Sequence, residues 1–236
     1  MSTSIRSSRL ATRVGGWSLI AAAIGFMSVF TYLAARFDYP DVLDGQAPKV
    51  LPQLLALGES GRAAWAFYAC LPLLLIPAGV GAYAALRQAA PNAMLTAIVL
   101  AALSAVSMLL GLARWPSIHW ELARTYAYAP PEARVAIDAT FTGVNLYLGN
   151  YIGEFVGELA LNGFFVVTGF AALHSTQVRR WFGLTGIAVG VAGWVGAFRN
   201  ISSLVGPIAE LNNYLLPVWL IVLGVVLIRW PATAAD

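Results

Sequence analysis

The chain has 236 residues, of which 59% are hydrophobic and only 11% are charged, and its mean hydropathy is +0.74. Soluble domains are less apolar and carry about twice this share of charge, so the composition excludes an ordinary soluble enzyme and a disordered or nucleic-acid-binding tail. The net charge of +3 comes from too few basic residues to indicate a nucleic-acid partner. We therefore expect an all-α, polytopic integral membrane protein whose main partner is the lipid bilayer.

Six apolar segments are long enough to cross a bilayer as helices, which takes about 20 residues each. They show no period-two alternation of the kind that a β-strand would need. Pro72 and Pro77 lie inside the second segment and should kink it. We place the spans, within one transmembrane domain covering residues 1–236, at 14–35, 63–86, 93–113, 151–173, 182–205 and 211–228.

Two long connections, residues 36–62 and 114–150, should form outer loops. In the first, the run that starts at Val50 suggests a short helix lying at the membrane interface. In the second, the Pro130–Pro131 pair breaks the chain, and proline is well suited to the start of a helix. From Glu132 to Leu173 nothing interrupts the pattern, so one long helix is expected there.

The basic residues of the short connections predict the orientation. Arg87 and the Arg179–Arg180 pair lie in short loops, and such loops face the cytoplasm when they are basic. Nearly all acidic residues then fall on the outer side. The first span follows a charged start, but its apolar stretch is longer than the 7–15 residues typical of a cleaved signal. We predict a retained first helix and an N-in, C-in topology.

Charged residues gather at one depth near the predicted outer boundary. With a rise of 1.5 Å per residue, Arg114, Arg199, Glu154 and Glu210 reach the same layer, and Glu158 lies about 6 Å deeper. Charges within spanning helices are costly and usually face the bundle interior or a cavity. The sequence therefore predicts an outward-facing polar layer.

The fourth span combines a polar stripe with a glycine stripe. The polar residues Asn150, Glu154, Glu158 and Asn162 recur every four positions and so share one helix face. Small residues at the same spacing allow another helix to approach closely. Spans four and five are expected to pack through such positions, which are Gly149, Gly153, Gly157, Gly186, Gly190 and Gly193.

Three interpretations of this layer stay open. The glutamates can pair with arginines from other spans and set the helix register, as buried ion pairs often do. They can instead line a pocket for a small ligand, or, less favoured, act as general acid or base in an enzyme. The candidate ligand-binding residues are Asn150, Glu154, Glu158, Asn162, Arg114, Arg199, His119 and Glu210.

Metal and cofactor sites are not expected. His119 lies in an outer connection and His174 at the inner end of the fourth span, too far apart to ligate one haem. A zinc site needs three or four ligands, which His119, Glu121 and Glu154 would supply only if the outer connection folded over them. The single cysteine, Cys70, cannot form an internal disulfide.

Several short motifs lie between Val14 and Arg229. They are Arg114-Trp115-Pro116, Leu122 to Tyr126, Tyr147-Leu148-Gly149, Gly153-Glu154, Gly157, Trp181 to Gly186, Gly190, Trp219-Leu220 and Leu223-Gly224 with Leu227. Together they resemble an uncharacterised bacterial family of six-helix membrane proteins catalogued as domain of unknown function 4386. The resemblance implies a protein of the bacterial inner membrane and brings no established activity, cofactor or catalytic residue.

Our leading hypothesis from the sequence is that the protein binds or transports a small polar molecule or a lipid. The alternative is a structural or regulatory subunit whose glycine stripes pack partner helices in a homo- or hetero-oligomer. Catalysis is the least favoured function, because no recognisable nucleophile or metal set is present.

Overall fold

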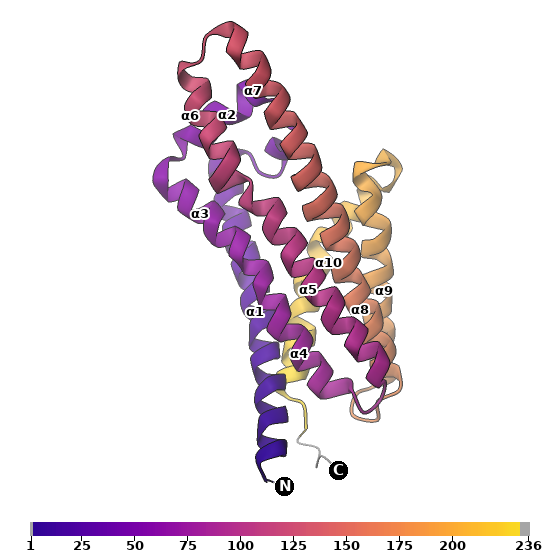
Figure 1. Ribbon diagram of the computed structural model, residues 1–236. Coiled ribbons are helices and arrows are strands. Elements are labelled where there is room, and N and C mark those ends of the chain that lie inside the picture. Colours follow the sequence, from indigo (N-terminus) through magenta and orange to yellow (C-terminus); the bar gives the residue numbers. More distant parts are fainter. Residues whose placement is uncertain (1, 232–236) are drawn as a thin grey trace.

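A computed structural model describes residues 2–231, with the side chains of residues 8–43 and 45–231. All regular elements in these residues are helices (Figure 1). The α-helices are α1 (Ser2–Phe37), α2 (Ala47–Ala56), α3 (Gly58–Cys70), α4 (Leu75–Leu86), α5 (Pro91–Ala113), α6 (Trp120–Tyr128), α7 (Pro131–Val144), α8 (Gly157–Leu173), α9 (Arg180–Ala197) and α10 (Gly206–Ile228). Shorter 3₁₀ or π-helical segments join several of them.

Six continuous helical stretches are long and apolar enough to cross a membrane, which confirms the predicted all-α, six-span fold. The side on which the termini lie stays a prediction. The stretches are Ser8–Phe37, Gly58–Leu86, Pro91–Tyr128, Pro131–Leu173, Arg180–Asn200 and Ser203–Ile228.

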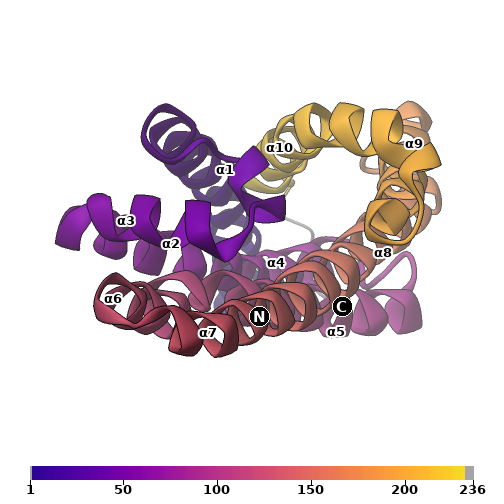
Figure 2. The ribbon, with the colours of Figure 1, turned by 90° about the horizontal axis from the view of Figure 1, so that it is seen from above.

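The spans form a ring. Helix α1 packs against α4 and α10, and the remaining contacts run from α4 through α5, α8 and α9 back to α10 (Figure 2). One apolar core joins the helices of the ring, and Leu19, Phe164 and Trp219 contribute to it.

The second span is interrupted where its prolines predict. A short 3₁₀ segment, Leu71–Leu74, separates α3 from α4 and contains Pro72. Proline lacks an amide hydrogen and clashes with the carbonyl one turn earlier, so it disturbs the α-helical hydrogen bonds of the preceding turn.

The expected second outer loop is instead largely a continuation of two spans. The third span passes through a π-helical turn, Trp115–His119, into α6, and so continues to Tyr128. The fourth begins at Pro131 and runs unbroken to Leu173, as predicted, with π-helical hydrogen bonding over Asn145–Val156. Pro116 lies in this widened segment, and because it has no amide hydrogen it cannot continue the α-helical hydrogen bonding of α5 at this point.

The boundary between the last two spans differs from the predicted one. Helix α9 ends at Ala197 rather than near residue 205, and α10 begins at Gly206 rather than at 211. Two 3₁₀ turns, Phe198–Asn200 and Ser203–Val205, connect them. Pro207 occupies the first turn of α10, a position that favours a helix start over a longer loop.

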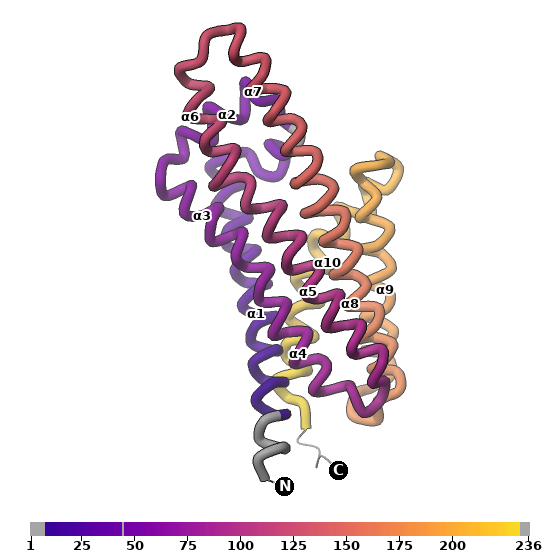
Figure 3. The backbone as a smooth tube through the Cα atoms, in the orientation of Figure 1, coloured from indigo at the N-terminus to yellow at the C-terminus, as the bar shows by residue number. Residues whose placement is uncertain are grey.

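Above the ring, the tube trace in Figure 3 shows α2, α6 and α7 rising beyond α9 and α10. We call this part, with the upper ends of α1 and α3, the upper extension. It has its own core, which includes Phe37, Trp65, Trp115 and Phe141. Helix α2 is the short helix predicted in the first connection; its apolar face packs against α6 and α7, and its Leu51 and Leu54 are fully buried. Its position at the membrane interface stays a prediction.

Candidate functional site

The most concentrated group of charges joins the fourth and fifth spans. The Arg199 guanidinium donates to both carboxylate oxygens of Glu158, over 2.6 and 2.7 Å, and to one oxygen of Glu154, over 3.0 Å. Arg199 can reach both acids because α9 has ended at Ala197 and the following 3₁₀ turn directs its side chain toward α8. Two carboxylates therefore share one cation, and we call these three residues the acidic cluster.

Asn200, in the same 3₁₀ turn as Arg199, contacts the acidic cluster. Its amide nitrogen donates to Glu154 Oε2 over 2.9 Å and to the backbone carbonyl of Asn150 over 3.0 Å. Asn150 is thus at the site through its main chain. Sequence analysis missed Asn200, although its position beside Arg199 at a span end was a usable signal.

The acidic cluster is partly open. The side chains of Arg199, Glu154 and Glu158 are 28%, 24% and 14% exposed, so Glu154 is more accessible than Glu158. A carboxylate can accept about four hydrogen bonds. Glu154 receives two from the protein, through one oxygen, which leaves its other oxygen free to accept a donor from outside.

Asn162 lies one turn deeper on the same face as Glu158. Its amide nitrogen donates to the Glu158 carbonyl over 2.8 Å, while its fully buried side-chain oxygen has no partner in the described structure. A side chain at Gly193 would overlap the Asn162 amide. Gly193 is therefore the position that lets α9 pass this buried amide.

Arg114 does not join the glutamates, so the structure corrects the idea that both arginines pair with them. Its Nε donates to Asn145 Oδ1 over 3.1 Å, and its Nη1 donates to the Gly111 carbonyl. Asn145 in turn donates to the Leu43 carbonyl over 2.7 Å. Arg114 thus belongs to the base of the upper extension, where it is only 4% exposed.

The two remaining candidates also lie outside the acidic cluster. His119 is fully buried between Trp115 and Phe141, with ring centroids 4.8 and 4.5 Å away. Glu210 is exposed on α10 and takes part in none of the ion pairs of the described residues. Within those residues there is no group of three or more histidine, cysteine or acidic side chains placed to hold a metal.

The two glycine stripes serve different contacts. On the fourth span, Gly149 faces the Arg114 guanidinium, Gly153 faces Gly111 and Gly157 faces Met108, so this stripe packs on α5 rather than on the fifth span. The fifth-span glycines face α8 and α10. Gly190 and Gly193 lie against Asn162 and its turn, and Gly186 lies against Trp219.

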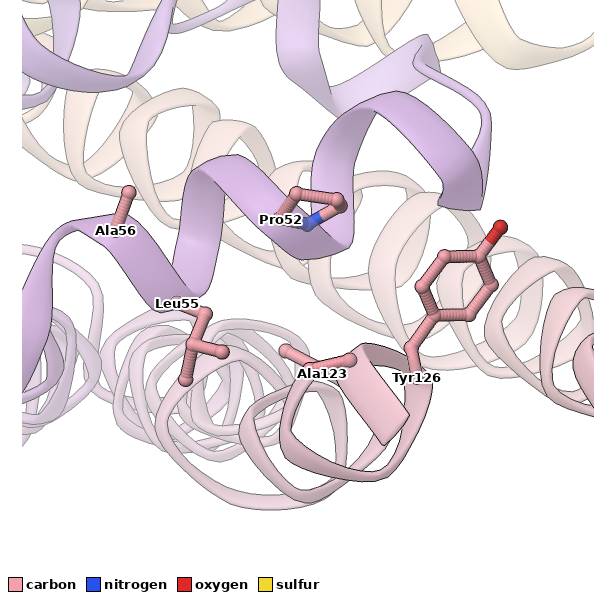
Figure 4. A pocket seen from close by; sticks show the side chains of 6 residues that line it. Pro52, Leu55, Ala56, Ala123 and Tyr126 are labelled. Carbon is pink, nitrogen blue, oxygen red and sulfur yellow. The ribbon is translucent and has the colours of Figure 1, made fainter. Parts of the chain in front are cut away.

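Two surface hollows were found away from the charges. One, of about 320 Å³, lies between α2 and α6 in the upper extension, and its lining is almost entirely apolar (Figure 4). Its walls are Pro52, Leu55, Ala56, Ala123, Tyr126 and Ala127. The other lies between α1 and α3 and includes Tyr32 and Phe67. The acidic cluster lines neither of these two hollows.

The ring of apolar helices defines a multi-pass α-helical membrane protein. Residues 14–228 match the family described as Domain of unknown function (DUF4386), and the chain belongs to this family. The match reaches into all six spans and includes Arg114 and the acidic cluster. No curated protein and no solved structure matches the chain.

Proposed function

We propose that the protein binds a small polar molecule or a lipid headgroup, with an ammonium group of the ligand at Glu154 and Glu158. The site would face outward from a bacterial inner membrane, with both termini in the cytoplasm. Transport of the same ligand is the more specific form of the proposal.

The observation that carries the proposal is the partial exposure of two carboxylates that share one guanidinium. Ionised groups in spanning helices are expensive and mark ligand or ion pathways. Here one guanidinium is hydrogen-bonded to two carboxylates, and the Glu154 carboxylate keeps a free oxygen. A hydrogen-bond donor that carries positive charge would occupy that unused acceptor.

A structural role is the second candidate, and the geometry at Glu158 favours it. The Arg199–Glu158 pair has two parallel hydrogen bonds and ties α8 to the turn after α9, an arrangement that sets helix register. The glycine stripe of the fourth span contributes less to an oligomer, because α5 of the same chain already covers it.

A thermal-stability titration of the purified protein in uncharged detergent separates the two candidates. Ethanolamine and phosphoethanolamine should raise the melting temperature saturably, because a ligand that binds only the folded state stabilises it. Glu154→Gln should weaken this response by about tenfold, the value of one charge-assisted hydrogen bond. Glu121→Gln, which removes an exposed acid paired with Arg124, is the matched control and should respond as the unmodified protein does.

A melting temperature that stays constant with both probes would contradict ligand binding at the acidic cluster and favour the structural role. An equal response in Glu154→Gln would place the ligand elsewhere.

A further inference from the structure

Arg114 is a buried cation without a carboxylate partner. Its side chain is 4% exposed, and none of the ion pairs within 4 Å among the described side chains includes it. Its protein acceptors are the neutral oxygens of Asn145 and Gly111. A buried charge is retained at a cost unless an opposite charge accompanies it. Glu154 attracts Arg114 from a distance, but it makes its hydrogen bonds to Arg199 and Asn200 instead.

Three further hydrogen-bond donors next to Arg114 lack acceptors. The indole nitrogens of Trp65 and Trp115 and both ring nitrogens of His119 are buried, and no partner for them is present in the described structure. An indole nitrogen only donates, and a neutral imidazole always carries one N–H. Buried polar groups in proteins are nearly always satisfied, so these three neighbouring donors are available to an acceptor that enters the site.

These side chains converge on one ring. The Arg114 Cζ lies 5.1 Å from the centre of the Trp115 ring, the Trp65 ring is stacked on Trp115 at 4.9 Å, and His119 lies edge-on to it at 4.8 Å. The four residues come from the second span, the end of α5 and the π-helical turn after it. We call them the Arg114 cluster.

The chemistry of the Arg114 cluster suits an anion that accepts several hydrogen bonds. A guanidinium matches the planar fork of a carboxylate or phosphate, and N–H donors held around it add directional bonds. A metal ion does not suit this site, because the guanidinium would repel it and the described residues offer no acidic ligand set here. Gly149 contributes by leaving room for the guanidinium, since a Cβ there would meet Arg114 at 2.5 Å.

We infer that the Arg114 cluster binds an oxyanion, a carboxylate or a phosphate, and that it holds the anionic end of the ligand whose ammonium group meets Glu154. The second half of this statement rests on the proposed function, and the first half does not. The ligand class is then a zwitterion, either a free solute or a phospholipid headgroup.

The test is a titration of the full-length protein with inorganic phosphate and, separately, acetate, each replacing chloride at constant ionic strength. Both oxyanions should raise the melting temperature saturably and change the intrinsic tryptophan fluorescence, because Trp65 and Trp115 are donors to the site. Arg114→Gln should abolish both responses. His119→Phe, which keeps the aromatic contacts and removes the donor, should weaken binding by about tenfold.

Arg134→Gln is the matched control, because Arg134 also stacks on an aromatic ring of the upper extension but lies over Tyr126 instead. It should bind phosphate normally. If Arg114→Gln does not fold, His119→Phe and Trp65→Phe carry the test. The inference is overturned if the unmodified protein shows no saturable response to either oxyanion, or if the variants of the Arg114 cluster respond as it does.

Two comparisons identify the source of the oxyanion and separate this inference from the proposed function. Short-chain phosphatidylethanolamine should act at lower concentration than phosphoethanolamine if the ligand is a lipid, and at equal concentration if it is a free solute. Glu154→Gln should weaken the ethanolamine response by about tenfold and leave the phosphate response intact. A phosphate response without any ethanolamine response would support the Arg114 cluster and contradict the acidic cluster.

Discussion

The ring of spans and the upper extension are packed by different means. In the ring, helices meet at glycines: Gly16 lies against Gly224, Gly15 against Gly81 and Gly169 against Gly183. In the upper extension the contacts are between large rings, with Trp65 stacked on Trp115 and Phe37 edge-on to both. Lipid offers no hydrophobic gain for helix association, so close backbone contact must supply it. The upper extension is built like a water-soluble core, where aromatic burial is the main favourable term.

The two groups of buried charge follow this division. The acidic cluster lies at the top of the glycine-packed α8–α9 pair, and the Arg114 cluster lies inside the aromatic core. One is partly exposed with an excess of acceptors, and the other is buried with an excess of donors.

Phe37→Ala should give the largest loss of stability, and the loss should appear first in the upper extension. Phe37 is 2% exposed, and truncating a buried phenylalanine costs about 3–5 kcal/mol. Hydrogen exchange should rise in α2 and α6 while the lower parts of α8 and α9 stay protected. Equal loss of protection in both regions would show that they unfold as one unit and would remove the distinction between them.

Gly153→Leu should destabilise the ring by about 3 kcal/mol, because even a Cβ at Gly153 would come within 2.8 Å of the Gly111 backbone. Gly143→Leu is the control on the same long helix, since a Cβ there meets nothing within 4 Å. Thermal melting in detergent measures both. Similar melting temperatures for the two variants would mean that the fourth span does not rely on close contact with α5.

In a double-mutant cycle with glutamine substitutions, the pair Arg199–Glu158 should show an interaction energy of about 1–2 kcal/mol. This exceeds the usual value for surface pairs, because Glu158 is largely shielded from solvent and accepts two hydrogen bonds from the arginine. The pair Arg199–Glu154 should show less, because Glu154 is more exposed and makes one bond to the arginine. The reverse order would make Glu154 the structural residue and Glu158 the one to test with ligands.

The topology can be tested without a change in stability. In a Cys70→Ser background, Thr176→Cys lies in the connection between α8 and α9, and Tyr128→Cys lies at the tip of the upper extension, where Tyr128 is 92% exposed. A membrane-impermeant thiol reagent added to intact cells should label only Tyr128→Cys. Labelling of Thr176→Cys alone would reverse the orientation and place both clusters on the cytoplasmic side.

Local sequence patterns were sufficient to predict the helices of the fold. Six long apolar runs have no stable alternative to spanning helices in lipid, since each backbone group must find its partner inside its own helix. The break at Pro72 and the helix start at Pro131 follow from single residues whose backbone chemistry acts locally. The stripe at Asn150, Glu154, Glu158 and Asn162 likewise follows from spacing along one helix.

Which groups meet across helices could not be deduced in this way. The sequence places Arg114 and Arg199 at the same depth. In the structure Arg199 meets two carboxylates, whereas Arg114 meets neutral oxygens and an indole ring. Depth depends on distance along a helix, which sequence spacing reports, whereas pairing depends on how neighbouring helices rotate and where each one ends. The early end of α9 at Ala197 turns Arg199 toward α8, and the π-helical turn after α5 places Trp115 and His119 beside Arg114. These helix ends and turns depend on contacts between segments far apart in the chain. The sequence therefore shows which charged residues lie within the spans, whereas tertiary packing decides which groups they contact.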